Sequence, residues 1–498
     1  MARKTERSAR PLSKSKYLTG LACHRLLWHE VHAGDLTELA PDLEAQFRME
    51  QGNAVEARAR AEFPGGVLVA SPDFAMEQRL EETARALVGG APFVFEATVA
   101  AAGAIVGADV LRRVSDGLEL IEIKQSLSVK DDDLEDVAFQ HWVLREAGLA
   151  IPRAFLMHLN KTARYPELAE LFVIEDVTDK VEPLLSAVPL ELAAQRAMLA
   201  AAEPPSPVLV RQCRKPKPCP LFEKCWPGFP EHHVSTLYQI RWKQVDKLLA
   251  AGRVTVDQLD ETETSYKEAR RQIRAVRAGR RIVEEGLGAA LDVLRPPVAW
   301  LDFESVGLAI PAWPLVAPHE NVPVQFSVHV TGVSGTSAHQ WLADPLTDPR
   351  PALAEALVRA CGSARTVVAY NAKFEKDCLK HLADAVPAYR DVLGEIHARV
   401  VDLLPIVRDH VYDPAFGGGF GLKKVLPALV SDPELSYDGL AVSDGGTATA
   451  LLARLLLEPE RIGGPPERER LRAQLLAYCA LDTRAMLRLA EALRAIAT

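Results

Sequence analysis

The chain has 498 residues, of which 48% are hydrophobic and 25% are charged, and its formal net charge is −9. This length exceeds what one ordinary hydrophobic core holds, so we expect two or three domains. The acidic balance excludes a surface that is basic throughout. No apolar run approaches the roughly 18–20 residues that a membrane span needs. A polar N-terminus and an odd number of cysteines (seven) lead us to expect a cytoplasmic protein with reduced thiols.

Basic residues gather in three local groups. The groups are Lys4, Arg7, Arg10, Lys14 and Lys16; Arg211, Arg214, Lys215 and Lys217; and Arg270, Arg271, Arg274, Arg277, Arg280 and Arg281. Basic stripes on an acidic chain suit an enzyme that binds nucleic acid beside catalytic carboxylates. Solvated helix faces explain any single group equally well.

Proline and glycine divide the chain into three regions of different character. Residues 1–228 mix helix and strand patterns, residues 231–290 show helical spacing, and residues 296–498 return to an alternating pattern. The breaks fall at Pro227-Gly228 and at Pro296-Pro297. We therefore predict the α/β (α+β) class, with two larger domains joined by a small helical linker.

The first region contains a cluster of catalytic residue types on consecutive predicted strands. The predicted strands are Phe93–Val99, Ala104–Val114, Leu118–Lys124 and Ala154–Leu159, with a helix between the last two. Alternation places Glu122 and Lys124 on one face, where Asp109 of the neighbouring strand can meet them. Two carboxylates and a lysine suit metal-dependent phosphodiester cleavage. A structural Glu–Lys pair at a sheet edge is the alternative.

Four cysteines bracket this region. One stands near the N-terminus, at Cys23, and three arrive together as C-x5-C-x5-C at Cys213, Cys219 and Cys225. Four thiolates gathered from distant positions suit an iron–sulfur cluster or a tetrahedral zinc ion. The remaining cysteines are isolated among apolar residues and are expected to be core side chains.

The middle region shows two short predicted helices around Ala251-Gly252-Arg253. The pattern resembles helix-hairpin-helix modules, which grip the nucleic-acid backbone, although the hairpin has only one glycine. On the helix that follows, Arg274 and Arg277 are candidate phosphate contacts. A plain connector is the alternative.

The third region carries a second acidic set. Asp302 and Glu304 are two residues apart on an apolar strand and share a face, and Tyr478 and Asp482 share a face of a late helix. Between them, a strand leads into an N-x-x-F-E motif that ends at Glu375. Carboxylates in this arrangement suit divalent cations.

A glycine-rich loop at residues 417–421 precedes Lys423 and Lys424. Its spacing is not that of a nucleotide P-loop. Its amides and these two lysines are candidate contacts for a phosphate of a bound strand; a flexible loop is the alternative.

The Asp109, Glu122-x-Lys124 and Gln140 series resembles the RecB-like branch of the PD-(D/E)XK nuclease superfamily. The resemblance implies Asp109 and Glu122 as Mg²⁺ or Mn²⁺ ligands and Lys124 and Gln140 as catalytic residues. It also assigns Glu56, on the preceding helix, a catalytic role. The chain departs from the family in lacking a tyrosine after Gln140 and a histidine near Glu56.

The cysteine arrangement is similar to that of RecB-like nucleases of the CRISPR-adaptation type and of AddB subunits. These hold a [4Fe–4S] cluster with one cysteine before the nuclease core and three after it. The resemblance implies Cys23, Cys213, Cys219 and Cys225 as cluster ligands. The x5 spacing between the first two of the trio is longer than usual, which keeps zinc as the alternative.

The third region resembles the DEDDy exonucleases, which have an RNase H-like fold. The resemblance implies Asp302, Glu304, Glu375 and Asp482 as ligands of two divalent ions, with Tyr478 positioning the attacking water. Glu375 stands where most members have aspartate.

The order of the three regions resembles a bacterial family that joins a RecB-like nuclease domain (1–228), a hairpin-like linker (231–290) and an RNase H-like exonuclease domain (296–498). It implies a metal-dependent nuclease acting on DNA with free ends or single strands, in repair, processing or defence. Two alternatives are a degenerate, iron–sulfur nucleic-acid-binding scaffold and an RNA-trimming exonuclease.

Overall fold

The computed structural model describes residues 10–33, 36–215, 217–333, 335–437, 439–442 and 444–497; Lys4 and Arg7 of the first basic group lie outside these ranges. The mixed α/β class is confirmed. The chain forms two compact units. The first comprises residues up to 227 together with 308–319, and the second comprises residues 228–307 together with 320 onward.

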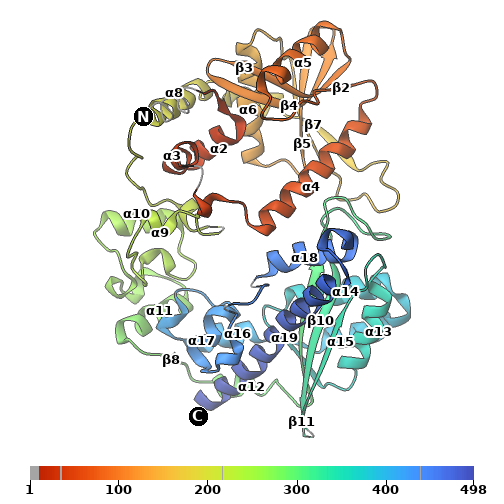
Figure 1. The fold of residues 1–498 in the computed structure, drawn as a ribbon. Coiled ribbons are helices and arrows are strands. Elements are labelled where there is room, and N and C mark those ends of the chain that lie inside the picture. Colours follow the sequence, from red (N-terminus) through yellow and green to blue (C-terminus); the bar gives the residue numbers. More distant parts are fainter. Residues whose placement is uncertain are drawn as a thin grey trace. The chain divides into compact units, whose positions relative to one another are not determined.

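The first unit is built on a seven-stranded sheet with helices on both faces (Figure 1). Its strands are β1 (Leu12–Ser13), β2 (Val67–Leu68), β3 (Phe93–Ala101), β4 (Ala104–Val114), β5 (Gly117–Lys124), β6 (Ala154–Leu159) and β7 (Phe172–Asp176). Its α-helices are α2 (Lys14–Ala22), α3 (His24–His32), α4 (Leu43–Ala59), α5 (Met76–Val88), α6 (Asp131–Glu146), α7 (Thr178–Val181), α8 (Val188–Leu199) and α9 (Phe222–Cys225).

The sheet order is β2-β3-β4-β5-β6-β7, and β1 pairs with β4. Strands β3, β4 and β5, which the sequence predicted, form an antiparallel meander, and β6 joins β5 in parallel after the α6 crossover. Strand β5 pairs with β4 only from Val110 onward, whereas β1 pairs with β4 at its start, from Ala104. Strands β1 and β5 therefore pair with different stretches of the same edge of β4.

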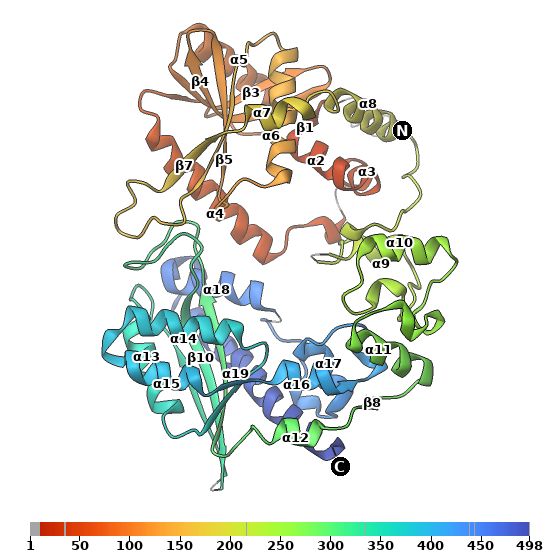
Figure 2. The ribbon, with the colours of Figure 1, turned by 180° about the vertical axis from the view of Figure 1, so that it is seen from behind.

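Alternating side chains give this sheet two apolar faces. Leu118 and Leu120 of β5 pack with helices α2, α6 and α8, whereas Ile121 and Ile123 pack with Val55 of α4. Figure 2 shows α4 and α6 on opposite sides of the strands. Glu122 has the parity of Leu120, so its side chain belongs to the face that α6 covers.

The second unit is built on a five-stranded sheet. The strands of the unit are β8 (Ile282–Val283), β9 (Val298–Val306), β10 (Val322–Gly332), β11 (Gly335–Leu342), β12 (Thr366–Ala369), β13 (Val400–Asp402) and β14 (Val411–Tyr412). Its α-helices are α10 (Trp242–Ala250), α11 (Lys267–Ala278), α12 (Leu287–Leu291), α13 (Arg350–Cys361), α14 (Lys373–Ala385), α15 (Arg390–Ala398), α16 (Leu403–His410), α17 (Leu422–Leu429), α18 (Gly445–Leu457) and α19 (Pro465–Ile496).

The order in this sheet is β11-β10-β9-β12-β13. Strands β9, β10 and β11 are antiparallel, and β12 and β13 continue the sheet in parallel. The short strands β8 and β14 form a separate antiparallel pair.

The two faces of this sheet bury different helices. Leu301 and Phe303 pack with α13, α14 and α15, whereas Trp300 packs with the long C-terminal helix α19 (Figure 1). Because Asp302 and Glu304 share the parity of Trp300, their side chains lie on the α19 face.

The segment 231–290 is part of the second unit. It has a small core of its own around Val245 and Ile273, and α11 is fixed by Arg271, whose guanidinium donates to the carbonyls of Arg408 and Asp409. The first predicted short helix is present as α10, but the second is only a 3₁₀ turn at Val256–Gln258. Too few residues separate that turn from the next for a longer helix to form.

None of the helices in the described part of the chain combines the length and the apolar character that crossing a bilayer requires.

Candidate functional sites

The first site lies where β5 faces α6. Glu122 is 1% exposed and Gln140 is fully buried. The Lys124 ammonium donates to Glu122 Oε1 at 2.7 Å, and Gln140 Nε2 donates to Glu122 Oε2 at 2.6 Å. The structure therefore brings together three of the residues that the sequence singled out, from one strand and one helix.

Asp109 joins them from β4. Its Oδ2 accepts from the backbone N–H of Ile123 at 2.7 Å, at the level where β4 and β5 no longer pair. Burial, reinforced by the charge of Glu122, raises the pKa of Asp109 well above its usual range. Glu56 is half-buried on α4. Burial and the charges of Glu96 and Glu122 raise its pKa as well.

Two further residues of this site did not stand out in the sequence as site residues. Lys14, at the start of α2, donates to Glu122 Oε1 at 2.7 Å and lies 3.5 Å from Asp136 Oδ1. Asp136, on α6, accepts from Gln140 Nε2 at 2.9 Å and is ion-paired with Lys124. Asp136 precedes Gln140 by one helical turn, a spacing that puts both on one face and was a usable signal. Lys14 is 108 positions from Glu122 in the sequence, and no sequence pattern indicated that the two residues are neighbours.

Two lysines offset the burial of Glu122 in the first site. Burial alone raises the pKa of Glu122, but Lys124 and Lys14 outweigh it and hold that pKa below its usual range. Glu122 and Asp136 in turn keep the pKa of Lys124 above its usual range despite burial. Both lysines are therefore charged at neutral pH.

Next to Asp109, the ladder between β3 and β4 is interrupted. Phe95 pairs with Val110 and Ala97 pairs with Ala108, while Glu96 between them has a φ of +55°. The left-handed region is uncommon for a residue that is not glycine, so Glu96 needs partners to hold it there.

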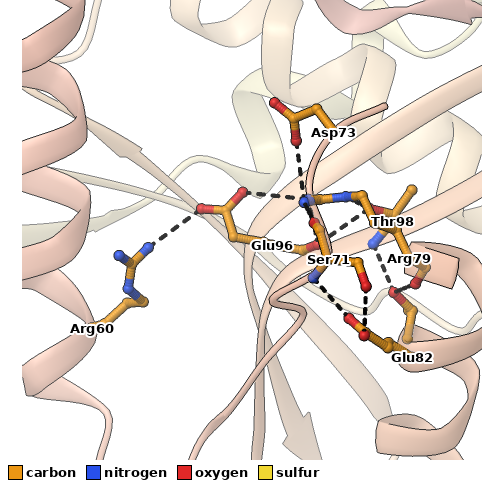
Figure 3. Close-up of polar contacts among 8 residues, drawn as sticks. Arg60, Ser71, Asp73, Arg79, Glu82, Glu96 and Thr98 are labelled. Atoms are coloured by element: carbon orange, nitrogen blue, oxygen red, sulfur yellow. Dashed lines mark hydrogen bonds and ion pairs between the residues drawn. The ribbon is translucent and has the colours of Figure 1, made fainter. Parts of the chain in front are cut away.

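Buried Arg79 supplies those partners (Figure 3). Its guanidinium donates to the carbonyl of Glu96 at 3.3 Å and to Thr98 Oγ1 at 2.9 Å, and it lies 3.9 Å from the Glu96 carboxylate. Arg60 approaches that carboxylate from the other side at 3.5 Å. These contacts surround the irregular residue Glu96 of β3 beside the aspartate-bearing strand.

The four cysteines singled out from the sequence line one small cavity of the first unit. Cys23 lies between α2 and α3, and Cys213, Cys219 and Cys225 come from the loop and short helix that end the unit. Burial raises the pKa of the Cys213 and Cys219 thiols, and the neighbouring cysteines add to the effect. The remaining three cysteines are buried, as expected.

The second site brings together three carboxylates. Oxygen atoms of Asp302, Glu304 and Asp482 all lie within 4.8 Å of one another. Strand β9 supplies Asp302 and Glu304, and helix α19 supplies Asp482. The structure therefore brings together the acids of the predicted strand and the acid of the predicted late helix. Oxygen ligands at this separation are those that Mg²⁺ and Mn²⁺ take.

These carboxyl groups hold their protons unusually strongly. Burial and the neighbouring carboxylate of Asp482 raise the pKa of Glu304 to about 8. Burial and the charges of Asp482, Glu304 and Glu375 raise the pKa of Asp302 well above its usual range. The cluster therefore resists full ionisation until positive charge arrives.

Glu375 lies in the first turn of α14 and is 4% exposed. Its Oε2 is buried without a hydrogen-bond partner among the described residues. Burial raises the pKa of Glu375 to about 7. Asp402, which caps α16, fixes the turn before α14 by accepting from the N–H of Asn371 at 2.9 Å.

Tyrosines and a lysine surround Asp482. The Tyr437 hydroxyl is hydrogen-bonded to the Asp482 carboxylate. The Lys423 ammonium lies 3.4 Å from the Tyr478 hydroxyl and 4.5 Å from the centre of the Tyr437 ring. Tyr437 was not predicted, because nothing in its loop sequence marks it.

A cavity of about 1020 Å³ opens over this cluster. Its lining includes Asp302, Glu304, Asp482, Tyr478, Lys423 and Lys424, together with the aromatic residues Tyr238, Tyr370, Phe374 and Phe420. Gly419 and Gly421 of the glycine-rich loop line the cavity. The neighbouring Gly418, whose φ is +83°, packs so closely that a Cβ there would meet the carbonyl oxygen of Thr236 at 2.0 Å.

The two arginines predicted to contact nucleic acid have partners within the unit. Arg274 is ion-paired with Glu284 at 2.5 Å, and Arg277 donates to the carbonyl of Asp257 at 3.0 Å. Arg271, on the same helix, is 3% exposed. Basic charge therefore does not run around the whole of α11, and a role in binding phosphates stays a prediction.

Comparison with known families finds similarity to a domain of unknown function, DUF2779, over residues 299–420. The matched segment begins in β9 and contains Asp302, Glu304 and Glu375, whereas Asp482 and nearly all of the first unit lie outside it. No curated protein matches the chain.

Proposed function

We propose that the chain is a metal-dependent DNA nuclease with two hydrolytic sites. The observation that carries the proposal is the acidic cluster of the second unit, in which oxygens of Asp302, Glu304 and Asp482 lie within 4.8 Å of one another. The cluster lies at the wall of a cavity lined by aromatic and basic side chains.

The strand arrangement supports an RNase H-like fold for the second unit. Three antiparallel strands are followed by two parallel ones in the order β11-β10-β9-β12-β13, with the acids on the central strand. In the first unit, two strands and the following helix bring together Asp109, Glu122, Lys124 and Gln140. This convergence supports a RecB-like fold for the first unit.

The residues of the second site fit divalent cations. The carboxyls of Asp302, Glu304 and Asp482 would hold them, and Glu375 has a buried oxygen without a partner. Bound Mg²⁺ or Mn²⁺ makes water more acidic and stabilises negative charge at a phosphodiester. The raised pKa values of these acids indicate that cation binding would displace protons from them.

The remaining groups of the cavity suit a single strand. Tyr478 places its hydroxyl beside the acids and is oriented by Lys423, in position to order a water molecule. Lys423 and Lys424 suit phosphate oxygens, and Tyr238, Phe374 and Phe420 offer ring faces on which bases stack without sequence preference.

In the first site, Asp109 and Glu122 would hold a divalent cation, and Lys124 would orient water. Glu56 lies close enough to be affected by the charge of Glu122. Unit 1 thus contains the residue types for a second hydrolytic centre.

The cysteine cavity fits a metal cofactor, because four thiols gather there from distant positions. We propose a [4Fe–4S] cluster as this cofactor, with a tetrahedral zinc ion as the alternative.

The test is Mn²⁺-dependent digestion of end-labelled single-stranded DNA by anaerobically purified protein. Wild type is compared with Lys124→Ala and Asp302→Ala, and with an RNA of the same sequence. We expect Asp302→Ala to remove end trimming and Lys124→Ala to remove any remaining cleavage. An active wild type with two fully active variants would refute both site assignments. An inactive wild type that binds DNA would favour the scaffold alternative, and a preference for the RNA would favour RNA trimming.

A further inference from the structure

We propose that Lys14 is a functional residue of the first site, a built-in cation that neutralises Glu122 and Asp136 and sets how tightly that site takes a divalent ion. The inference rests on the proposed metal chemistry of this site. It assigns a role to a residue from the N-terminal segment, outside the strands and helix that carry the other site residues.

The backbone holds Lys14 in place from both sides. Leu12 is buried and its N–H donates to the carbonyl of Gly103 at 3.0 Å, in the pairing of β1 with β4. Ser13 then caps helix α2, of which Lys14 is the first residue. Strand β1 occupies the part of the β4 edge that β5 leaves open. The lysine is thereby delivered to the point where the two strands diverge.

The contacts of Lys14 are with the acids of the site. Its ammonium is 2.7 Å from Glu122 Oε1 and 3.5 Å from Asp136 Oδ1, and its side chain is 25% exposed. A carboxylate offers about four acceptor positions. Lys14, Lys124 and Gln140 together take three of those on Glu122 among the described residues. A divalent ion at Glu122 therefore shares this carboxylate with two ammonium groups.

Electrostatics gives the expected sign of the effect. With Lys14 present, two ammonium groups balance Glu122 and Asp136. Without it, one ammonium faces two buried carboxylates, and a divalent ion gains attraction at short range. A lysine that served only to hold Glu122 in position would have the opposite effect, because its loss would loosen a ligand and weaken ion binding.

The experiment uses the full chain carrying Asp302→Asn, Glu304→Gln and Asp482→Asn, which removes the three clustered carboxylates of the second site. Free Mn²⁺ is titrated by electron paramagnetic resonance in the parent and in Lys14→Met, Lys14→Arg and Lys16→Met. Lys16 lies on the same helix but acts on Glu30, so its variant controls for loss of one charge. Circular dichroism confirms that each variant is folded.

We expect Lys14→Met to bind Mn²⁺ about tenfold more tightly than the parent, and Lys14→Arg and Lys16→Met to stay within about twofold of it. The arginine variant keeps the charge if the methionine variant fails to fold, and an affinity unlike the parent's would then overturn the inference. Unchanged or weaker Mn²⁺ binding in Lys14→Met overturns the inference about Lys14 but leaves the proposed metal chemistry of the first site standing. Absence of Mn²⁺ binding in every variant overturns both the inference and the proposed metal chemistry of the first site.

Discussion

Both units bury carboxylates at one face of a sheet, but they balance the charge differently. In the first unit, Glu122 contacts two lysines and a glutamine and its pKa is lowered, whereas burial raises the pKa of Asp109 and of Asp136. In the second unit, Lys423 is the cation that acts on Glu304 and Asp482, and the pKa of both acids is raised. Protein cations thus neutralise Glu122 of the first cluster, whereas the acids of the second cluster keep their protons until an added cation displaces them.

The largest expected effect is on the stability of the first site, around Glu122. Changing Lys124 to methionine leaves two buried carboxylates with Lys14 alone, and we expect a loss of about 3–5 kcal/mol in the opening free energy of the first sheet. Hydrogen exchange of the β5 amides measures it locally. Lys130→Met, at the N-cap of α6, is the control. A loss of opening free energy below about 1 kcal/mol would mean that Lys124 and Glu122 behave as a solvent-screened surface ion pair.

The second cluster should respond to cations instead. At a free Mn²⁺ concentration 100 times the dissociation constant, we expect the second unit to gain about 2.7 kcal/mol of stability. The gain should disappear in Asp302→Asn and persist in Lys124→Met, because only the former loses a ligand of this cluster. Thermal unfolding with and without Mn²⁺ measures it. An equal gain in Asp302→Asn would place the ion elsewhere.

A smaller effect is expected from pH in the absence of metal. Glu304 has a folded pKa of about 8, against about 4.3 when unfolded. Between these values the folded state keeps a proton that the unfolded state has lost, so stability falls as pH rises through the window. Glu122 has the opposite sign: its lowered pKa contributes stability that is lost on acidification.

The measurement is the unfolding temperature in EDTA from pH 6 to 8.5, for wild type and Glu304→Gln. The variant should show a flatter profile for the second unit. Identical profiles would show that Glu304 is already ionised in the folded, metal-free protein.

The smallest expected effect concerns α11. Arg274→Ala should change stability by less than about 1 kcal/mol, since the side chain is 42% exposed and its ion pair with Glu284 is screened. If Arg274 and Arg277 also contact phosphates, the double alanine variant should lower the salt dependence of single-strand binding by about 0.7 per contact. Fluorescence anisotropy at several salt concentrations measures the slope. An unchanged slope would restrict strand binding to other surfaces.

Local periodicity was enough to predict the strands that carry the site acids and the acids on them. Asp302 and Glu304 follow from alternation, and Tyr478 and Asp482 from helical spacing, so both pairs were found without knowing the fold. The meander that carries Asp109 and Glu122 was likewise bounded to within two residues at each strand end. Their mutual approach needed the family resemblance, because sequence spacing does not reveal which elements pack together.

The residues that were missed depend on long-range packing. Lys14 appeared only as one member of a basic group, and its contact with Glu122 arises from the pairing of β1 with β4. Glu96 lies in a run that reads as a regular strand, and its positive φ depends on buried Arg79. Tyr437 reaches Asp482 from a loop. No local pattern contains these partners.

One short stretch near the N-terminus serves several parts of the first unit at once. Within residues 12–23 lie an edge strand, the ammonium group of Lys14, the ring of Tyr17 stacked at 4.2 Å on Phe139, and the cavity thiol of Cys23. Phe139 adjoins Gln140 on α6. A truncated protein that began at the aspartate-bearing strand would retain Asp109, Glu122, Lys124 and Gln140 yet lose a sheet partner, a counter-charge, a ring contact and one of the four cavity thiols together. Domain boundaries for expression should therefore be drawn upstream of Leu12.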